Sequence, residues 1–195
     1  MSNVNTDILI WRRGDAYPAN WPEWLKAADI EWCQIEITKS GRVMWYDGVW
    51  YDGVWGNGAW HDGEWHDGVW YDGVWYNGIW HGGHWLDGEW HDGEWHDGEW
   101  FRGAWYDGIW HDGDWHAGTW RNGEWFDGVW YYGAWFGGEW RDGTWRNGEW
   151  FDGVWYNGVW ANGIWRDGEW RDGEWHGGKW YDAGEWRPDG PPRRR

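Results

Sequence analysis

Tryptophan occupies every fifth position from Trp45 to Trp180, an unbroken series of 28 residues. Each unit reads W-x-D/N-G-z, so a turn dipeptide separates successive tryptophans and three residues, z-W-x, remain between turns. In an extended segment of three residues, the central side chain points to one side and its two neighbours point to the other. The series therefore predicts an all-β repeat protein with the tryptophans on one side and the x and z residues on the opposite surface.

The composition indicates a folded array. The chain of 195 residues contains 33 Trp and 35 Gly and carries a net charge of −18. Disordered chains are poor in aromatic residues, whereas each buried Trp removes about 150–250 Å² from water. The acidic charge disfavours direct nucleic-acid binding by the repeat body, because phosphates require Lys and Arg. Cys33 is the single cysteine, which excludes an intramolecular disulfide.

Three segments differ in composition. Residues 1–44 are not repetitive, and we interpret them as a cap or docking segment with a short helix within 20–29, a strand at 31–37 and a turn at 39–41. Residues 45–186 form the repeat body, and residues 187–195 form a basic, Pro-rich tail. We expect no signal peptide and no membrane span, because the N-terminus has neither a basic start nor a long apolar core.

The turn dipeptide has one strict position. Gly follows the D/N position in every intact unit, whereas Arg102, Ala117 and Tyr132 replace Asp or Asn. Only the glycine is therefore expected to need positive φ, where a Cβ is costly. The Asp or Asn is expected to act as a turn former.

A longer period is superimposed on the five-residue one. Residues 121–145 and 146–170 are identical at nineteen of 25 positions. We interpret the chain as a β-solenoid in which each pentapeptide is one side and five pentapeptides make a 25-residue coil with Trp inside. This arrangement predicts about 5.5 coils and a body about 26 Å long at ~4.8 Å per layer. A superhelical antiparallel meander with a hairpin at each unit stays open as the alternative, although hydrogen-bond parity argues against its simplest form.

In a 25-residue coil, aromatic x residues would align into columns beside apolar z residues. Such a patch on the outer surface indicates a partner interface, because monomers rarely expose large apolar areas. The predicted partner-binding residues are these columns together with the basic tail: Phe101, Tyr106, Phe126, Tyr131, Phe151, Tyr156, Arg193, Arg194 and Arg195.

The unit resembles known repeats. Gly123-Glu124-Trp125-Phe126-Asp127-Gly128 is similar to the central G-x-W-x-x-G of MORN repeats, which form antiparallel hairpins. The five-residue spacing resembles the pentapeptide-repeat family, whose square solenoid has a central Leu or Phe where this chain has Trp125. Residues 45–186 also resemble Trp-rich repeat proteins of tailed bacteriophages and bacteria, and this resemblance implies a virion-associated product.

Metal and catalytic chemistry is not favoured by the pattern. His66, His91 and His116 would share one column of a 25-residue coil and could bind a transition metal, but exposed His paired with Glu, as in His91–Glu94, is the favoured interpretation. The Asp residues of the turns could suggest calcium, but their replacement by other residues favours turn chemistry. No Ser/His/Asp or Cys/His arrangement stands out. We expect no enzyme, no catalytic residues, no metal and no cofactor.

The sequence thus favours a structural or assembly protein. A fibre, spike or decoration protein of a phage virion is the concrete hypothesis, with the chain itself or other virion proteins as partners and with a virion or cytoplasmic location. The alternative is an acidic DNA-mimic inhibitor or a glycan-binding module. Arg121, Arg146 and Arg171 interrupt the acidic side, which counts against DNA mimicry.

Overall fold

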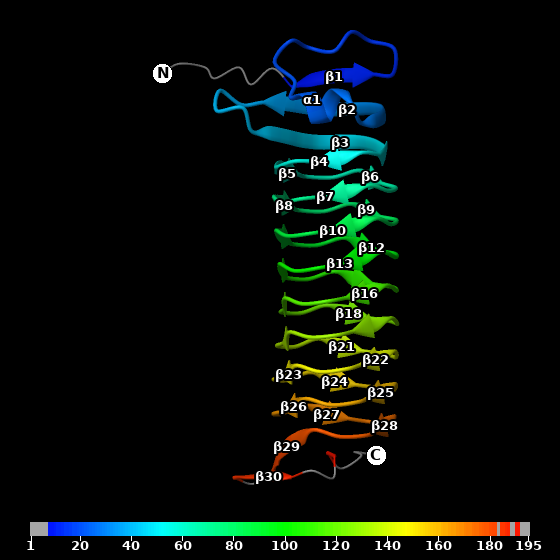
Figure 1. The fold of residues 1–195 in the computed structure, drawn as a ribbon, viewed down its shortest axis with the longest axis vertical. Helices are drawn as coiled ribbons and strands as arrows, with labels where there is room; N and C mark the ends of the chain where they lie inside the picture. Colours follow the sequence, from blue (N-terminus) through cyan, green and yellow to red (C-terminus); the bar gives the residue numbers. More distant parts are fainter. Residues whose placement is uncertain (1–7, 183, 188–189, 192–195) are drawn as a thin grey trace.

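The computed structural model describes residues 8–182, 184–187 and 190–191. Short parallel strands stack coil upon coil into a β-solenoid, which Figure 1 shows as a column with the N-terminal elements at one end. Each strand pairs with the strand three units later, as in Trp55↔Trp70 and Trp70↔Trp85. One coil therefore contains three pentapeptides, or 15 residues. The solenoid with Trp inside is confirmed.

The expected 25-residue circumference is wrong, and so is the antiparallel alternative, because the pairing is parallel at 15-residue steps. The coil is narrower and the body longer than expected. The sheet on one side contains nine strands, so the body is about 43 Å long at ~4.8 Å per layer, instead of about 26 Å.

The three sides of the coil are called faces A, B and C. Face A contains, in addition to the start of β3, the strands β5 (Gly58–Trp60), β8 (Val74–Trp75), β11 (Glu89–Trp90), β14 (Ala104–Trp105), β17 (Thr119–Trp120), β20 (Ala134–Trp135), β23 (Glu149–Trp150), β26 (Ile164–Trp165) and β29 (Lys179–Asp182). Face B contains, after the end of β3, the strands β6 (Glu64–Trp65), β9 (Ile79–Trp80), β12 (Glu94–Trp95), β15 (Ile109–Trp110), β18 (Glu124–Trp125), β21 (Glu139–Trp140), β24 (Val154–Trp155) and β27 (Glu169–Trp170).

Face C is the nine-stranded sheet of β4 (Val54–Trp55), β7 (Val69–Trp70), β10 (His84–Trp85), β13 (Glu99–Trp100), β16 (Asp114–Trp115), β19 (Val129–Trp130), β22 (Thr144–Trp145), β25 (Val159–Trp160) and β28 (Glu174–Trp175). Faces A and B belong to one sheet because β3 (Val43–Asp52) continues from the first face to the second.

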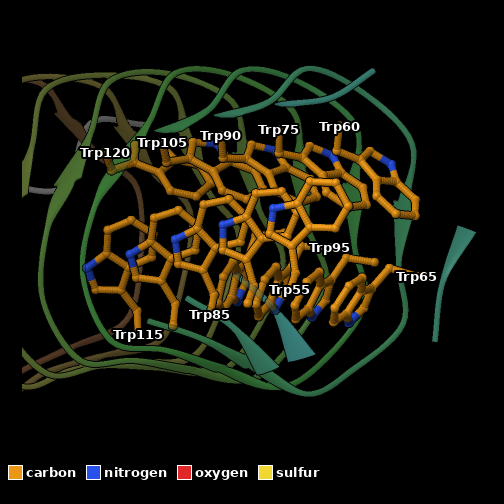
Figure 2. Close-up of a cluster of buried hydrophobic side chains, with 14 of the residues drawn as sticks. Trp55, Trp60, Trp65, Trp75, Trp85, Trp90, Trp95, Trp105, Trp115 and Trp120 are labelled. Carbon is orange, nitrogen blue, oxygen red and sulfur yellow. The ribbon is translucent and has the colours of Figure 1, made fainter. Parts of the chain in front are cut away.

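The interior is a stack of indole rings. The tryptophans from Trp45 to Trp160 are fully buried. Along one column, successive rings lie parallel, as in Trp85 and Trp100 with centroids 4.7 Å apart and planes at 6°. Within one coil, neighbouring rings meet edge to face, as in Trp85 and Trp90 at 6.0 Å and 74°. Figure 2 shows these rows of stacked indoles inside the coil. Both geometries suit the charge distribution of aromatic rings.

Glycine makes the corners between faces possible. The turn glycines have positive φ, for example 115° at Gly128, as the sequence predicted. A Cβ on Gly128 would overlap the carbonyl oxygen of Gly113 in the coil below and would lie 3.0 Å from the Gly113 nitrogen. The preceding Asp127 accepts a hydrogen bond of 2.7 Å through Oδ1 from the Gly128 N–H. Asp thus acts as a turn former, while Gly is required by both φ and space.

The N-terminal segment covers one end of the stack. It comprises β1 (Leu9–Arg12), the helix α1 (Glu23–Lys26) and β2 (Asp29–Ile37), and β2 pairs antiparallel with both β1 and β3. The Trp24 ring contacts Trp55 edge to face at 5.3 Å. The helix and the strand were predicted, but β1 was not.

The other end is formed by a hairpin. The strand β29 pairs parallel with β26 and antiparallel with β30 (Glu185–Arg187). The five-residue spacing of the tryptophans ends at Trp180, which lies in β29, so the regular pattern ends with the last strand of face A.

Candidate functional sites on the faces and corners of the solenoid

The residues on either side of each tryptophan share one outer face. Because z and x are two positions apart on one strand, their side chains lie beside each other. Glu139 and Arg141 form such a pair at 2.7 Å, and Glu89 and His91 form another at 3.4 Å. The expected His91–Glu94 pair is wrong, since Glu94 lies on the next face. Arg141 also contacts Glu124 of the neighbouring coil at 3.3 Å.

The six aromatic residues predicted to bind a partner do not form one face. At 15-residue steps, two of them lie on each side of the solenoid: Tyr106 and Phe151 on face A, Phe126 and Tyr156 on face B, and Phe101 and Tyr131 on face C. The 25-residue columns are therefore wrong, because a shift of 25 residues moves a side chain two faces around the coil. Arg193, Arg194 and Arg195 lie outside the described residues.

Arginine stacks on several of the predicted aromatic residues. Arg121 lies 5.1 Å from the ring of Tyr106, and Arg146 lies 5.1 Å from the ring of Tyr131. Arg171 lies 4.4 Å from the ring of Tyr156. These cation–π contacts cover part of the aromatic surface. Tyr106, Tyr131 and Tyr156 are accordingly half-buried, whereas Phe101 and Phe126 are exposed.

The corners differ in charge. Corner AB, which follows face A, consists of the dipeptides from 47–48 to 167–168 and has Asp at six of nine coils. Corner BC, from 52–53 to 172–173, has Asp at seven of nine coils. Corner CA, from 57–58 to 177–178, has Asp at two. The solenoid thus carries two acidic edges and one edge that is nearly neutral.

Asparagine relieves repulsion within the acidic edges. Asn122 donates a hydrogen bond from Nδ2 to Oδ2 of Asp107 in the coil below at 3.2 Å, and Asn157 donates in the same way to Asp142 at 3.0 Å. Like charges stacked at the spacing of strands destabilise a sheet. The Asn residues therefore reduce the electrostatic repulsion within the long Asp columns.

Three departures from the turn pattern meet on corner CA. Arg102, Ala117 and Tyr132 are 15 residues apart, so they occupy consecutive coils. The strand pairs Ala104↔Thr119 and Thr119↔Ala134 fix this register on one side of the corner. On the other side, the rings stack at 4.8 and 5.0 Å in the order Phe101, His116, Tyr131.

We call this surface the aromatic corner. Its members share the absence of a carboxylate, and they are Phe101, Arg102, Ala104, His116, Ala117, Thr119, Tyr131, Tyr132 and Ala134. Tyr132 is 61% exposed. A groove of about 930 Å³ runs along corner CA from Trp24 and Arg42 to Gly103 and Ala104, where it meets the aromatic corner. The five-residue pattern shows the three departures in the sequence, but it does not predict that they lie together.

Four histidines form a continuous column on face B. On face B, four consecutive coils present His66, His81, His96 and His111, with ring centroids 4.6, 5.2 and 4.7 Å apart in that order. The predicted grouping of His66 with His91 and His116 is wrong, because these residues lie on faces B, A and C. Burial lowers the pKa of His81, and the neighbouring His66 and His96 lower this pKa further, while Glu64 opposes the shift. His81 is therefore neutral near pH 7.

No protein-family model, no curated protein and no solved structure matches the chain. Within the described residues, no helix has the length and apolar character needed to cross a membrane. The regular Trp-lined solenoid is consistent with a Trp-rich pentapeptide repeat.

Proposed function

We propose that the protein is a structural or assembly element, a stiff β-solenoid rod that associates through the aromatic corner. The observation that carries this proposal lies at the aromatic corner, on the nearly neutral edge: three coils in succession have Arg102, Ala117 and Tyr132 at the turn position that is usually Asp or Asn. They lie beside the stacked rings of Phe101, His116 and Tyr131. Interface cores are poor in charge and rich in Tyr and Phe. Two of the predicted partner-binding residues, Phe101 and Tyr131, belong to this surface.

The charge of the chain favours a second copy as the occupant. Two rods that each carry a net charge of −18 repel each other, and this repulsion is strongest where the Asp columns of corners AB and BC would meet. At the aromatic corner, Arg102 is paired with Asp87 at 2.9 Å, so little net charge remains. Side-by-side packing through this surface is therefore the association that costs the least electrostatic free energy.

The Trp interior supports the structural role. The indole stack fills the coil, and the surface chemistry follows the repeat, which leaves few residues for a unique catalytic pocket. We propose accordingly that the chain is not an enzyme. The virion setting, as a fibre, spike or decoration protein, rests on the resemblance to Trp-rich phage proteins. Mass spectrometry of purified particles from the source organism tests that setting.

The association is tested by restoring the turn pattern. The double variant Ala117→Asp with Tyr132→Asp gives the aromatic corner the residue that most other corners have, so the turns should form as before. The control is Asn147→Asp with Asn162→Asp, which adds the same charge to corner CA two coils further along. Sedimentation equilibrium of the wild type should show a dimer or larger species, which the control retains and the Ala117→Asp/Tyr132→Asp variant loses. A wild type that stays monomeric at about 100 μM, or a variant that assembles like the wild type, would refute the proposal.

A specific observation also favours the second candidate, an acidic DNA mimic. Corners AB and BC are two parallel rows of Asp on either side of face B. The Arg residues that were expected to interrupt the acidic side lie on faces A, C and B, one on each. The measurement is competition, in which the chain should displace double-stranded DNA from a sequence-independent DNA-binding protein at physiological salt. Lack of displacement at a large molar excess argues against mimicry.

A further inference from the structure

The four-histidine column of face B has an internal order that the repeat does not require. The ring spacing alternates, with His66–His81 at 4.6 Å, His81–His96 at 5.2 Å and His96–His111 at 4.7 Å. The column thus consists of two pairs. It ends at Tyr51 on one side and at Phe126 on the other, and both of these rings stack on the terminal histidines.

Glutamate follows the same alternation. On the neighbouring z positions of face B, Glu64 and Glu94 alternate with Ile79 and Ile109, so that each pair of histidines has one carboxylate. Glu64 lies 3.4 Å from His66, measured from Oε2 to Nε2. Glu94 lies 3.4 Å from His96 and 3.8 Å from His111, measured between the same atoms. The face therefore repeats a Glu–His–His trio every two coils.

The donor atoms of each trio converge. In the first trio, Glu64, His66 and His81 each offer one nitrogen or oxygen, and these three atoms lie within 4.8 Å of one another; Glu94, His96 and His111 do the same in the second trio. Metal–ligand bonds of about 2.0–2.2 Å set the ligand atoms of a tetrahedral site about 3.3 Å apart. The ligand atoms of a trio must therefore move closer to one another by about 1.5 Å or less. Rotation of these partly exposed side chains supplies this movement.

The chemistry of the donors selects the metal. Two imidazoles and one carboxylate are the protein ligands of many zinc sites, with a further position open to water. Imidazole favours Zn²⁺, Cu²⁺ and Ni²⁺ over Ca²⁺ and Mg²⁺, which prefer oxygen. The acidic corners AB and BC flank face B and raise the local concentration of cations. His111 Nε2 is buried and has no hydrogen-bond partner in the described part of the chain, although Glu94 lies near it.

We propose that face B binds two Zn²⁺-class transition-metal ions, one at Glu64–His66–His81 and one at Glu94–His96–His111. Each ion joins two adjacent coils, because its histidines come from strands that follow one another on the same face. Binding requires no change in the Trp interior, and this surface is separate from the aromatic corner. The proposal and the proposed association are therefore tested independently.

The chain supplies a matched control on face A. His91 Nε2 lies 3.4 Å from Glu89 Oε2, the same distance as between His66 and Glu64. However, the rings that stack on His91 are Tyr76 and Tyr106, so this histidine has no imidazole neighbour in its column. His91→Gln therefore removes one surface histidine and one Glu–His pair without removing a Glu–His–His trio.

The experiment measures metal stoichiometry on the full chain after removal of any affinity tag. The protein is dialysed against Zn²⁺ in buffer that contains millimolar Mg²⁺, which occupies carboxylate-only positions, and bound zinc is measured by atomic emission. We expect two ions per chain for the wild type and for His91→Gln. We expect one ion for His81→Gln and one for His111→Gln. The double variant His81→Gln/His111→Gln should bind none.

Other outcomes contradict the proposal. A wild type that binds fewer than two ions, a double variant that retains zinc, or an equal loss in His91→Gln would each overturn it. Near-UV circular dichroism of the indole stack checks that the variants are folded. If a histidine variant is not folded, Glu64→Gln with Glu94→Gln gives the second test, since it keeps the side-chain shape and should still lower the zinc affinity at least tenfold. A second readout is the melting temperature, which zinc should raise in the wild type and not in the double variant.

Discussion

The turn glycine at Gly128 allows a direct test of the stacking geometry. Replacing it with alanine has two separate costs. The first is the positive φ of 115°, which costs an L-residue about 1–2 kcal/mol. The second is space, since the new Cβ would overlap the Gly113 carbonyl oxygen. That oxygen accepts the ladder hydrogen bond from the Val129 N–H at 3.0 Å.

Relief of the overlap requires the two coils to separate locally. This movement weakens the Val129–Gly113 hydrogen bond, which contributes about 1 kcal/mol, and loosens the indole stack beneath it. We therefore expect Gly128→Ala to lower the free energy of unfolding by about 2–3 kcal/mol, from the sum of the φ cost and the lost hydrogen bond. The measurement is urea denaturation followed by near-UV circular dichroism.

Two control variants separate the causes. Gly41→Ala has φ +80° with no atom within 4 Å of the new Cβ, so it should cost only the φ term of about 1–2 kcal/mol. Asp127→Ala removes one exposed hydrogen bond and should cost at most about 1 kcal/mol, since Ala117 already occupies the equivalent position. If Gly128→Ala costs no more than Gly41→Ala, the close approach between coils is not a constraint and the reasoning fails.

Three further outcomes are expected. Small-angle scattering of the monomer should give a rod whose repeat body is about 43 Å long; a maximum dimension above 100 Å would exclude it. Trp24→Ala should lower stability by about 3 kcal/mol in thermal melts, because Trp24 covers Trp55; an unchanged melting temperature would mean that the cap does not protect the stack. Burial raises the pKa of the Cys33 thiol from 9.0 to about 12, so it should resist alkylation in the folded chain at pH 8 and react after unfolding. The same shift should make stability fall as pH rises from 9 towards 12, because the unfolded thiol loses its proton first.

The five-residue pattern predicted much of the fold because the packing of the core depends only on the regular positions of Trp and Gly. Trp at every fifth position specifies the interior, and Gly128 with its equivalents specifies the corners. The strand at 31–37 and the helix near Glu23 followed from local signals. The strand β1 was missed because its pairing with β2 is non-local and Leu9–Arg12 is short.

The number of sides could not be obtained from the same pattern. A pentapeptide side can close a coil of three, four or five, and the choice depends on how indoles fill the interior. The expectation of five sides per coil was wrong. Three edge-to-face indoles with centroids 6.0 to 6.5 Å apart, as in Trp45, Trp50 and Trp55, already fill the triangle, whereas a ring of five would leave its centre empty. Close packing disfavours such a void.

Signals for the 15-residue period were nevertheless present on the surface. Four histidines from His66 to His111 follow one another at this step, and so do Arg102, Ala117 and Tyr132. The similarity between residues 121–145 and 146–170 includes more positions than either 15-residue series, so it suggested a 25-residue coil instead. A series of similar surface residues is weak evidence for the number of residues in a coil. A coil made of any whole number of pentapeptides keeps the tryptophans aligned.

The core and the surface of this solenoid therefore follow different periods, and this separation has a consequence for function. A 25-residue segment consists of five sides, which is one coil and two further sides. Repetition of that segment preserves every core contact but moves each outer side chain by two faces. Phe126 lies on face B while its equivalent Phe151 lies on face A, and Arg121 on face A corresponds to Arg146 on face C. Nearly identical segments thus contribute to different surfaces, so a binding site on this chain is defined by residues 15 apart, as at the aromatic corner and in the Glu–His–His trios.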